Sequence, residues 1–492
     1  MELEFIKSEV PYLKTMVSET QLQEQTQEVR IADGMPDIGR VLCGWGQVLV
    51  RGKQWRTGSV GVNGGVLAWV LYMPENGTQM QCVETWLPFQ MKWDVDSSVQ
   101  NGSIVVLPFL RCVDARLVSA RKLLVRTEVG VSVQARCAEH IDTYIPGDLP
   151  DGLCVKEKVY PATFPREVGE KAFTVTEKTE GAALEKIVYY TITPQVTEQR
   201  FIGDKLLFRG SALLHILALS TDGALVTRDL ELPFSQYCEV TGEYDENDRC
   251  QILFAVTDLE LQKDTTGDLT LKAGLLAQLV ICSHTLLQTV EDAYSTRKEA
   301  EPQIRMLNMP AILDTVTETV PVKHHIQLDG RQVIDSTFYP DVPGLYRDDE
   351  GITAALSGQI SALVKDFEGQ IQCVQERWEG EQNIPADNGV GVEVGVIPDG
   401  VQVVSADGEF STQMEMRLQF QNENQIPVIT GVSLGEDKMR DPQRPNLILC
   451  RTGERSLWDI AKIIGSTEEA IKKANGLTDE PERDRMLLIP VE

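Results

Sequence analysis

The residues with reactive side chains in this sequence do not fall into a known catalytic pattern. Ten cysteines are scattered from Cys43 to Cys450 without a Cys-x-x-Cys pair, and five histidines form no ligand set. The chain has no Gly-x-x-x-x-Gly-Lys-Ser/Thr loop for a nucleotide phosphate and no His-Glu-x-x-His zinc motif. We therefore predict no catalytic residue, no metal site and no cofactor, and we do not expect an enzyme.

Two weaker patterns could still be interpreted as sites. Gly389, Gly391 and Gly395 suggest a dinucleotide-binding loop, but no helical pattern follows them, so we interpret them as a turn. The pair His324-His325 precedes an apolar run, which places at least one imidazole on the outer face of a strand and disfavours a metal role. A pair of glycosidase carboxylates could be present among the 74 acidic residues, yet the internal repeats described below share none.

The elements needed to position a binding site are clearest in residues 446–492. A first helix is predicted by the i, i+3, i+4, i+7 spacing of Leu457, Ile460, Ala461 and Ile464. A second helix is predicted to start with a capping box of Ser466 and Glu469 and to end at Asn475-Gly476. A short strand is expected on each side, which gives the order strand, helix, helix, strand.

This order and its residues resemble the LysM domain. The matching segments are Gly-x-x-Ser-Leu-Trp-Asp-Ile-Ala-Lys from Gly453, Ala-Asn-Gly-Leu from Ala474, and Leu-x-Ile-Pro from Leu487. The resemblance implies a shallow groove between two loops that holds glycans containing N-acetylglucosamine. It assigns the partner- or glycan-binding role to the following residues: Thr452, Gly453, Glu454, Arg455, Ser456, Trp458, Asn475, Gly476, Leu477, Thr478 and Asp479.

Two departures from the LysM pattern bear on the ligand. The first loop is one residue longer than the usual Gly-Asp-Thr/Ser-Leu, and the usual Pro-Gly-Gln turn is replaced by three charged residues, 483–485. A longer, charged rim favours a protein partner, with Glu454 and Arg455 as rim contacts. Trp458 is either an exposed aromatic anchor or packs beneath the first strand, and a cap without any ligand is a further alternative.

The body of the chain repeats itself with a period of 146 residues. Gly77, Gly223 and Gly369 open similar strand-like segments, and Pro194 and Pro340 open similar tripeptides at the same spacing. A period this long indicates tandem domains, each with its own core, and not a solenoid. The repeat is the strongest internal evidence in the sequence.

Within each copy the pattern predicts strands. Met414 to Phe420 alternates apolar and polar residues, as expected for a sheet with one solvated face. We therefore expect a mainly β chain of three tandem sandwich- or barrel-like domains followed by a small βααβ LysM domain. Few helices are expected in the body, the best candidate being Ser18 to Val29. The predicted domains are residues 1–145, 153–295 and 304–434, then a polar, semi-flexible linker, 435–445, and the C-terminal domain, 446–492.

Length and composition place limits on partners and location. The chain has 492 residues, 42% of them hydrophobic, and a formal net charge of −28. This charge repels phosphate, so nucleic acid and anionic lipid are not expected partners. No N-terminal signal pattern is present, and no apolar run approaches the roughly 20 residues that span a bilayer. Scattered cysteines suit a reducing cytosol.

The repeats followed by a LysM-like end resemble the SipL-like proteins of endospore-forming Firmicutes, whose repeated β unit is called the SPOCS domain. The resemblance implies a non-enzymatic spore-envelope scaffold in the mother-cell cytoplasm. Such a protein is recruited to the forespore surface by the coat ATPase SpoIVA, with the LysM domain as the protein-binding part. The alternatives are a peptidoglycan- or chitin-type glycan-binding protein and, less favoured, a wall-modifying hydrolase.

Overall fold

The computed structural model describes all residues except 78, 182, 246, 266, 348–350, 385–389, 406, 440–442, 482–483 and 492. Side chains are not described for 313, 314, 390–401, 403 and 423 either. The chain is mainly β, as predicted, with two short helices near its C-terminus. Within the described residues, no helix is both long and apolar enough to cross a membrane.

The strands fall into three successive groups that match the predicted copies. The first copy holds β2 (Ile6–Arg30), β3 (Ile38–Arg56), β4 (Ser59–Pro74), β5 (Gln81–Asp94), β6 (Ser103–Ser119) and β7 (Lys122–Ile145). The second holds β8 (Leu153–Thr179), β9 (Leu184–Ile202), β10 (Lys205–Ser220), β11 (Leu225–Glu239), β12 (Arg249–Lys263) and β13 (Leu269–Ser295). The third holds β14 (Lys298–His325), β15 (Gln332–Pro340), β16 (Gly344–Arg347), β17 (Ile352–Lys365), β18 (Ile371–Ile384), β19 (Val390–Val404) and β20 (Glu409–Asp437).

The same pairing order occurs in all three groups. In each, the long first strand pairs with the long last strand, which also pairs with the strand before it: β2-β7-β6, β8-β13-β12 and β14-β20-β19. The intervening strands form a second sheet: β3-β4-β5, β9-β10-β11 and β15-β17-β18, with β16 also on β17. All these pairs are antiparallel, and the short β1 (Glu2–Glu4) extends the third copy's sheet by pairing with β20. The 146-residue repeat in sequence is therefore matched by a repeat in topology.

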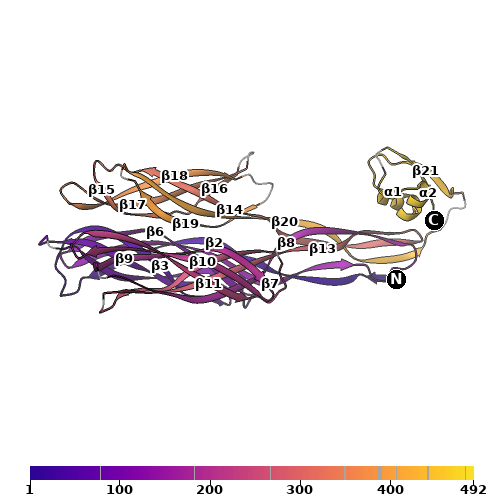
Figure 1. The fold of residues 1–492 in the computed structure, drawn as a ribbon. Coiled ribbons are helices and arrows are strands. Elements are labelled where there is room, and N and C mark those ends of the chain that lie inside the picture. The colour runs from indigo at the N-terminus through magenta and orange to yellow at the C-terminus, as the bar shows by residue number, and fades with distance from the viewer. Residues whose placement is uncertain are drawn as a thin grey trace.

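The ends of the long strands form a structure that we call the stalk, made of the paired ends of β2–β7, β8–β13 and β14–β20. One buried cluster joins the three pairs, including Tyr12 and Ile141, Phe164 and Leu287, and Val428. Figure 1 shows β8, β13 and β20 running from the strand-rich body toward the C-terminal helices. Apolar side chains from three strand pairs thus bury one another where no single pair could form a core.

The expectation that each copy has its own core is only partly correct. One buried cluster lies within the third copy and another almost wholly within the first, but the cores are not separate. The largest buried cluster joins Trp45 of the first copy, Tyr189 and Phe208 of the second, and Leu363 and Ile371 of the third. The ring of Trp45 stacks on that of Tyr189 with centroids 4.5 Å apart. Sheets of neighbouring copies therefore cover each other, a packing that strand periodicity within one copy does not reveal. The domain boundaries themselves stay a prediction.

Two element predictions in the body are also wrong. Ser18 to Val29, the candidate helix, lies in β2 and pairs residue by residue with β7. Pairing with a strand about 100 residues away overrides the weak local preference, as is usual for β structure. Residues 295–303, expected to separate the second and third copies, mostly belong to β14, where Ala300 pairs with Leu434 of β20. The loop between Ile145 and Leu153 agrees with the prediction.

A polar cluster lies at the seam between the second and third copies. His215 Nδ1 is 2.6 Å from an oxygen of Asp229, and its Nε2 is 3.1 Å from an oxygen of Asp335. The hydroxyl of Tyr189 donates to the other oxygen of Asp335 at 2.5 Å. Burial by itself lowers the pKa of His215, but hydrogen bonds to the two carboxylates and their charges outweigh it and raise the pKa to about 10.

This histidine makes stability pH-dependent. Its folded pKa lies above the ordinary value of 6.5, so the stabilisation is complete below pH 6.5 and is lost as the pH rises through about 10. We expect the free energy of unfolding of the wild-type chain, measured with urea, to fall by a few kcal/mol between pH 6.5 and 10. The free energy of unfolding of the His215→Gln variant should fall distinctly less over the same pH range. Equal losses in both proteins would contradict this assignment.

Candidate binding site at the C-terminal module

The C-terminal module comprises β21 (Leu447–Arg451), α1 (Leu457–Ile464), α2 (Glu468–Asn475) and β22 (Met486–Pro490), in the predicted order. Ser456 caps α1 by accepting a hydrogen bond from the amide of Asp459, whose carboxylate accepts in return from Ser456. Gly476 ends α2 in a left-handed conformation at φ 62°, as its type suggests. These local signals place the two loops of the predicted site.

The predicted capping box at Ser466 is wrong by one residue. Ser466 is fully buried, and its amide donates to Ala461 as part of the end of α1. The N-cap of α2 is Thr467, whose hydroxyl accepts from the amide of Ala470 at 3.1 Å. The connection between the helices is so short that Ser466 completes the first helix and cannot start the second.

Two further residues of the predicted site also have structural roles. Thr452 is buried, and its hydroxyl accepts from the amide of Arg485 at 3.0 Å. The amide side chain of Asn475 donates to Ile471 and Leu488 and accepts from Leu488, which fastens the end of α2 to β22. Both residues stabilise the module through these hydrogen bonds. This role accounts for their side-chain types without a ligand.

The first predicted loop does form a groove, but its second wall lies further along the chain than expected. A groove of about 380 Å³ is lined by Thr452–Ser456 and by Trp458, Glu468, Glu480 and Pro481. The predicted residues Asn475–Asp479 do not line it. Glu480, which the sequence did not single out, accepts from the amide of Leu457 at 3.2 Å and so joins this wall to the start of α1. Lys156 of β8 also lines the groove, so the stalk contributes to one of its borders.

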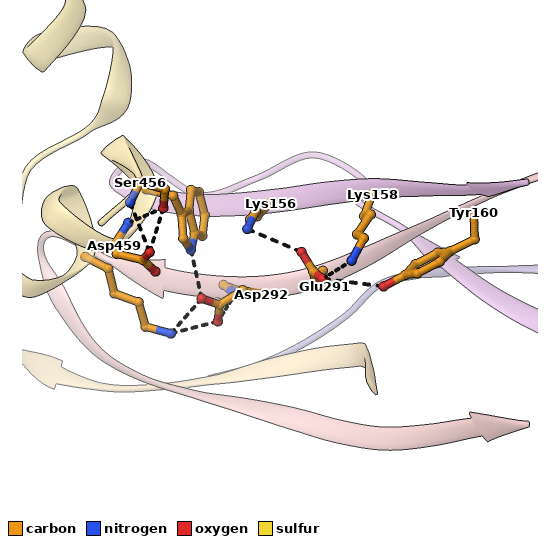
Figure 2. A network of polar contacts seen from close by, with 10 residues as sticks. Lys156, Lys158, Tyr160, Glu291, Asp292, Ser456 and Asp459 are labelled. Atoms are coloured by element: carbon orange, nitrogen blue, oxygen red, sulfur yellow. Dashed lines mark hydrogen bonds and ion pairs between the residues drawn. The ribbon is translucent and has the colours of Figure 1, made fainter. Parts of the chain in front are cut away.

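Trp458 is not the exposed anchor that was one of its two interpretations. It is only 5% exposed, and its indole N–H donates to Asp292 near the end of β13 at 2.8 Å. Its ring meets the edge of Tyr294, with centroids 4.8 Å apart and planes at 70°. Figure 2 shows Asp292 at the centre of this contact, below the cap formed by Ser456 and Asp459. Trp458 belongs to the module's core, as the other interpretation held, and also attaches the module to the stalk.

Further contacts strengthen this attachment. Lys462 of α1 donates to both oxygens of Asp292, at 2.8 and 2.7 Å. The hydroxyl of Tyr294 donates to the carbonyl of Ser466 at 2.9 Å. Glu291, the neighbour of Asp292, instead pairs with Lys156 and Lys158 of β8, which ties the two stalk strands to each other (Figure 2). The module thus has a defined docking face on the stalk.

The predicted linker, 435–445, starts too early, because residues up to Asp437 belong to β20, and both of its described ends are held by contacts. Lys438 donates through its amide to the carbonyl of Arg297 at 2.8 Å and through Nζ to that of Ser295 at 2.9 Å. At the other end, Arg444 donates to the carbonyl of Ile464 at 2.5 Å. The part at 440–442 lies outside the described residues. These contacts restrict the module at the positions where the chain enters and leaves the linker.

The opposite face of the module carries exposed apolar side chains. Leu447, Leu449, Met486 and Leu488 are 52%, 62%, 50% and 39% exposed. They alternate along β21 and β22 with residues that face the helices, and Leu449 pairs directly with Leu488. We call these four residues the outer apolar face. This face was not predicted, although the sequence carries its signal: apolar residues occupy both sides of each strand, whereas a sheet with one wet face alternates apolar and polar residues.

The remaining candidate sites of the sequence do not assemble. His324 pairs with Glu376 at 2.7 Å, while His325 lies 3.7 Å from Glu409. The neighbouring histidines therefore face different carboxylates and share no ligand set. Gly391 and Gly395 lie in β19, so the interpretation as a turn is wrong there, and Gly389 lies outside the described residues.

The described part of the chain brings together one trio of possible metal ligands, Glu9, His140 and Asp142. Lys7 already pairs with both carboxylates, at 2.8 and 3.1 Å, so its ammonium group supplies the positive charge there. Such an exposed cluster is explained by ordinary surface ion pairs.

A serine motif is present that the sequence analysis overlooked. Residues Gly431 to Gly435 read Gly-x-Ser-x-Gly, the spacing of a hydrolase nucleophile turn. That motif needs a sharp strand-to-helix turn to expose its serine. Here Ser433 lies within the extended β20, between its partners Glu2 of β1 and Glu301 of β14. Its backbone therefore lacks the geometry of a nucleophile turn.

A cleft of about 1300 Å³ lies between the second and third copies. Its walls include Glu243, Asp245 and Asp248 as well as Arg249, His284, Glu415 and Arg417. Arg417 forms an ion pair with Glu415 and donates to the carbonyl of Ile252 at 3.2 Å. The charge of Arg417 is thus already matched by Glu415 on the same strand.

Comparisons with protein-family models, with curated proteins and with solved structures find no match to this chain.

Proposed function

We propose that this protein is a non-enzymatic scaffold in endospore envelope assembly. In this proposal three tandem SPOCS-like β modules form a rigid body in the mother-cell cytoplasm. The LysM-like C-terminal module binds a coat morphogenetic protein, a SpoIVA-like ATPase, and so recruits the scaffold to the forespore surface. The sequence resemblance to SipL-like proteins suggests the setting, and the geometry of the module supports the binding role.

The observation that carries the proposal is the asymmetry of the module. One side is fixed to the stalk through Trp458, Lys462 and Asp292, whereas the outer apolar face is left exposed. Large apolar side chains that are contiguous and exposed mark sites of association with other proteins. A body whose copies are joined by a buried cluster is well suited to hold such a module in a fixed orientation.

Co-purification from sporulating cells tests this function. A tagged full-length chain should capture the coat ATPase, and a chain ending at Pro445 should retain its folded body but lose the partner. Folding of the shortened body can be checked by its thermal unfolding transition. Undiminished capture by the shortened chain would refute the role of the module.

Glycan binding is a second candidate because the groove between Thr452–Ser456 and Glu480–Pro481 has a volume of about 380 Å³. This volume is within the usual range of small-ligand sites, roughly 300–1,000 Å³. In this case the full-length chain should be retained on chitin or peptidoglycan and released by chito-oligosaccharides. Absence of retention would eliminate this candidate.

A further inference from the structure

Two cysteines, one from the first copy and one from the third, lie next to each other where these copies meet. Cys43 lies on β3 of the first copy and Cys373 on β18 of the third, and their sulfur atoms are 2.9 Å apart. This distance is within about 1 Å of the length of a disulfide bond. Other cysteines of the body use their thiols differently: Cys82, for example, donates to the carbonyl of Val188 at 2.9 Å.

The seam between β3 and β18 is fixed by independent contacts. The guanidinium of Arg40 on β3 donates to the carbonyl of Ile371 on β18 at 3.0 Å. Farther along the boundary of the same two copies, Arg111 pairs with Asp341 at 2.7 Å. Because contacts other than the thiols hold the two copies together, the sulfur atoms face each other without needing a bond to bring them there.

We propose that Cys43 and Cys373 form a disulfide bond that joins the first and third copies when the protein meets a small-molecule disulfide such as oxidised glutathione. In a reducing cytosol both residues stay thiols. The pair is thus a redox-dependent modification site, separate from the binding role of the C-terminal module.

The two thiols have different accessibility, which sets the order of the reaction. Cys373 is partly exposed, whereas Cys43 is buried. The Cys373 thiolate attacks the small disulfide, forms a mixed disulfide and releases one small thiolate. The Cys43 thiolate then attacks the sulfur of Cys373 and releases the second. Two cysteine thiols are oxidised, one small disulfide is reduced to two thiols, and the two protons move to those products.

Burial and the hydrogen bond between the thiols influence the rate of the second step. The hydrogen bond to Cys373 and desolvation raise the pKa of Cys43 well above its ordinary value. Since the thiolate is the attacking species, closure should accelerate as the pH is raised. The bond closes a loop of more than 300 residues, and a long loop of this kind restricts the unfolded chain strongly.

The test uses the full-length chain treated with oxidised glutathione. Peptide mapping without reductant should recover a peptide pair that joins Cys43 to Cys373, and the intact mass should fall by two hydrogens. The midpoint of thermal unfolding should rise by roughly a few degrees and return to its starting value after dithiothreitol. The Cys373→Ser variant should show none of these changes, and Cys82→Ser, which leaves the pair intact, should behave as wild type.

Three outcomes would overturn the proposal. They are glutathione retained on Cys373 without closure, a bond from either residue to another cysteine, and no reaction of Cys373 at pH 8.5 under conditions that oxidise an unfolded control. Peptide mapping of the wild-type chain detects the disulfide bond directly, so the test remains decisive even if a serine variant folds poorly.

Discussion

Replacing Leu449 and Leu488 by aspartate should weaken capture of the partner by at least about a hundredfold. The two side chains lie opposite each other on the outer apolar face, and each would be buried by a docked protein. Burial of one leucine contributes about 1.5–3 kcal/mol, and a charge in its place must also be desolvated. Affinity measured with the purified partner checks this expectation.

The matched control carries aspartates at Val159 and Leu286, two residues of the stalk that are exposed to a similar degree. It changes charge and exposed apolar area in the same way but leaves the module untouched. Full affinity is expected for the control. An equal loss in both double variants would show that the outer apolar face has no special role.

Asp292→Ala should release the module from the stalk without unfolding either part. The change removes the acceptor for Trp458 and both bonds from Lys462, and it leaves the indole N–H without its partner. Hydrogen bonds to charged groups contribute about 1.5–3 kcal/mol, so the open form should become roughly ten- to a hundredfold more populated. The rate of limited proteolysis between Asp437 and Leu447 should rise by the same factor.

Glu291→Ala is the control for this prediction. Glu291 is adjacent to Asp292 but bonds to Lys156, Lys158 and Tyr160 of β8, not to the module. It should leave proteolysis of the linker close to the wild-type rate. If Asp292→Ala is cleaved no faster than Glu291→Ala, the contact between module and stalk is not stabilised as described.

The fold was predictable where its causes are local. The first helix of the C-terminal module follows from the spacing of Leu457, Ile460 and Ala461, and the second ends at Gly476, as its sequence predicts. The repeated order of strands follows from a 146-residue period that is visible in the glycines and prolines. Such signals depend on residues a few positions apart, or on simple recurrence, and the sequence contains both.

The errors have a common cause in long-range contact. Residues 18–29 form a strand because β7 offers them a partner, and buried side chains join the copies where Trp45 stacks on Tyr189 across a boundary. The same applies to the site. The residues next to Trp458 in the sequence do not indicate that Asp292, 166 residues earlier, accepts its hydrogen bond. The outer apolar face was accessible from the sequence, since strand residues on both sides of β21 and β22 are apolar.

Hydrogen–deuterium exchange of the full-length chain, with and without the purified coat ATPase, tests most directly whether the exposed side of the C-terminal module binds another protein. We predict that the partner slows exchange in residues 447–451 and 486–490 and leaves the long strands of the body unchanged. Protection confined to residues 1–437, with none in the module, would contradict the account.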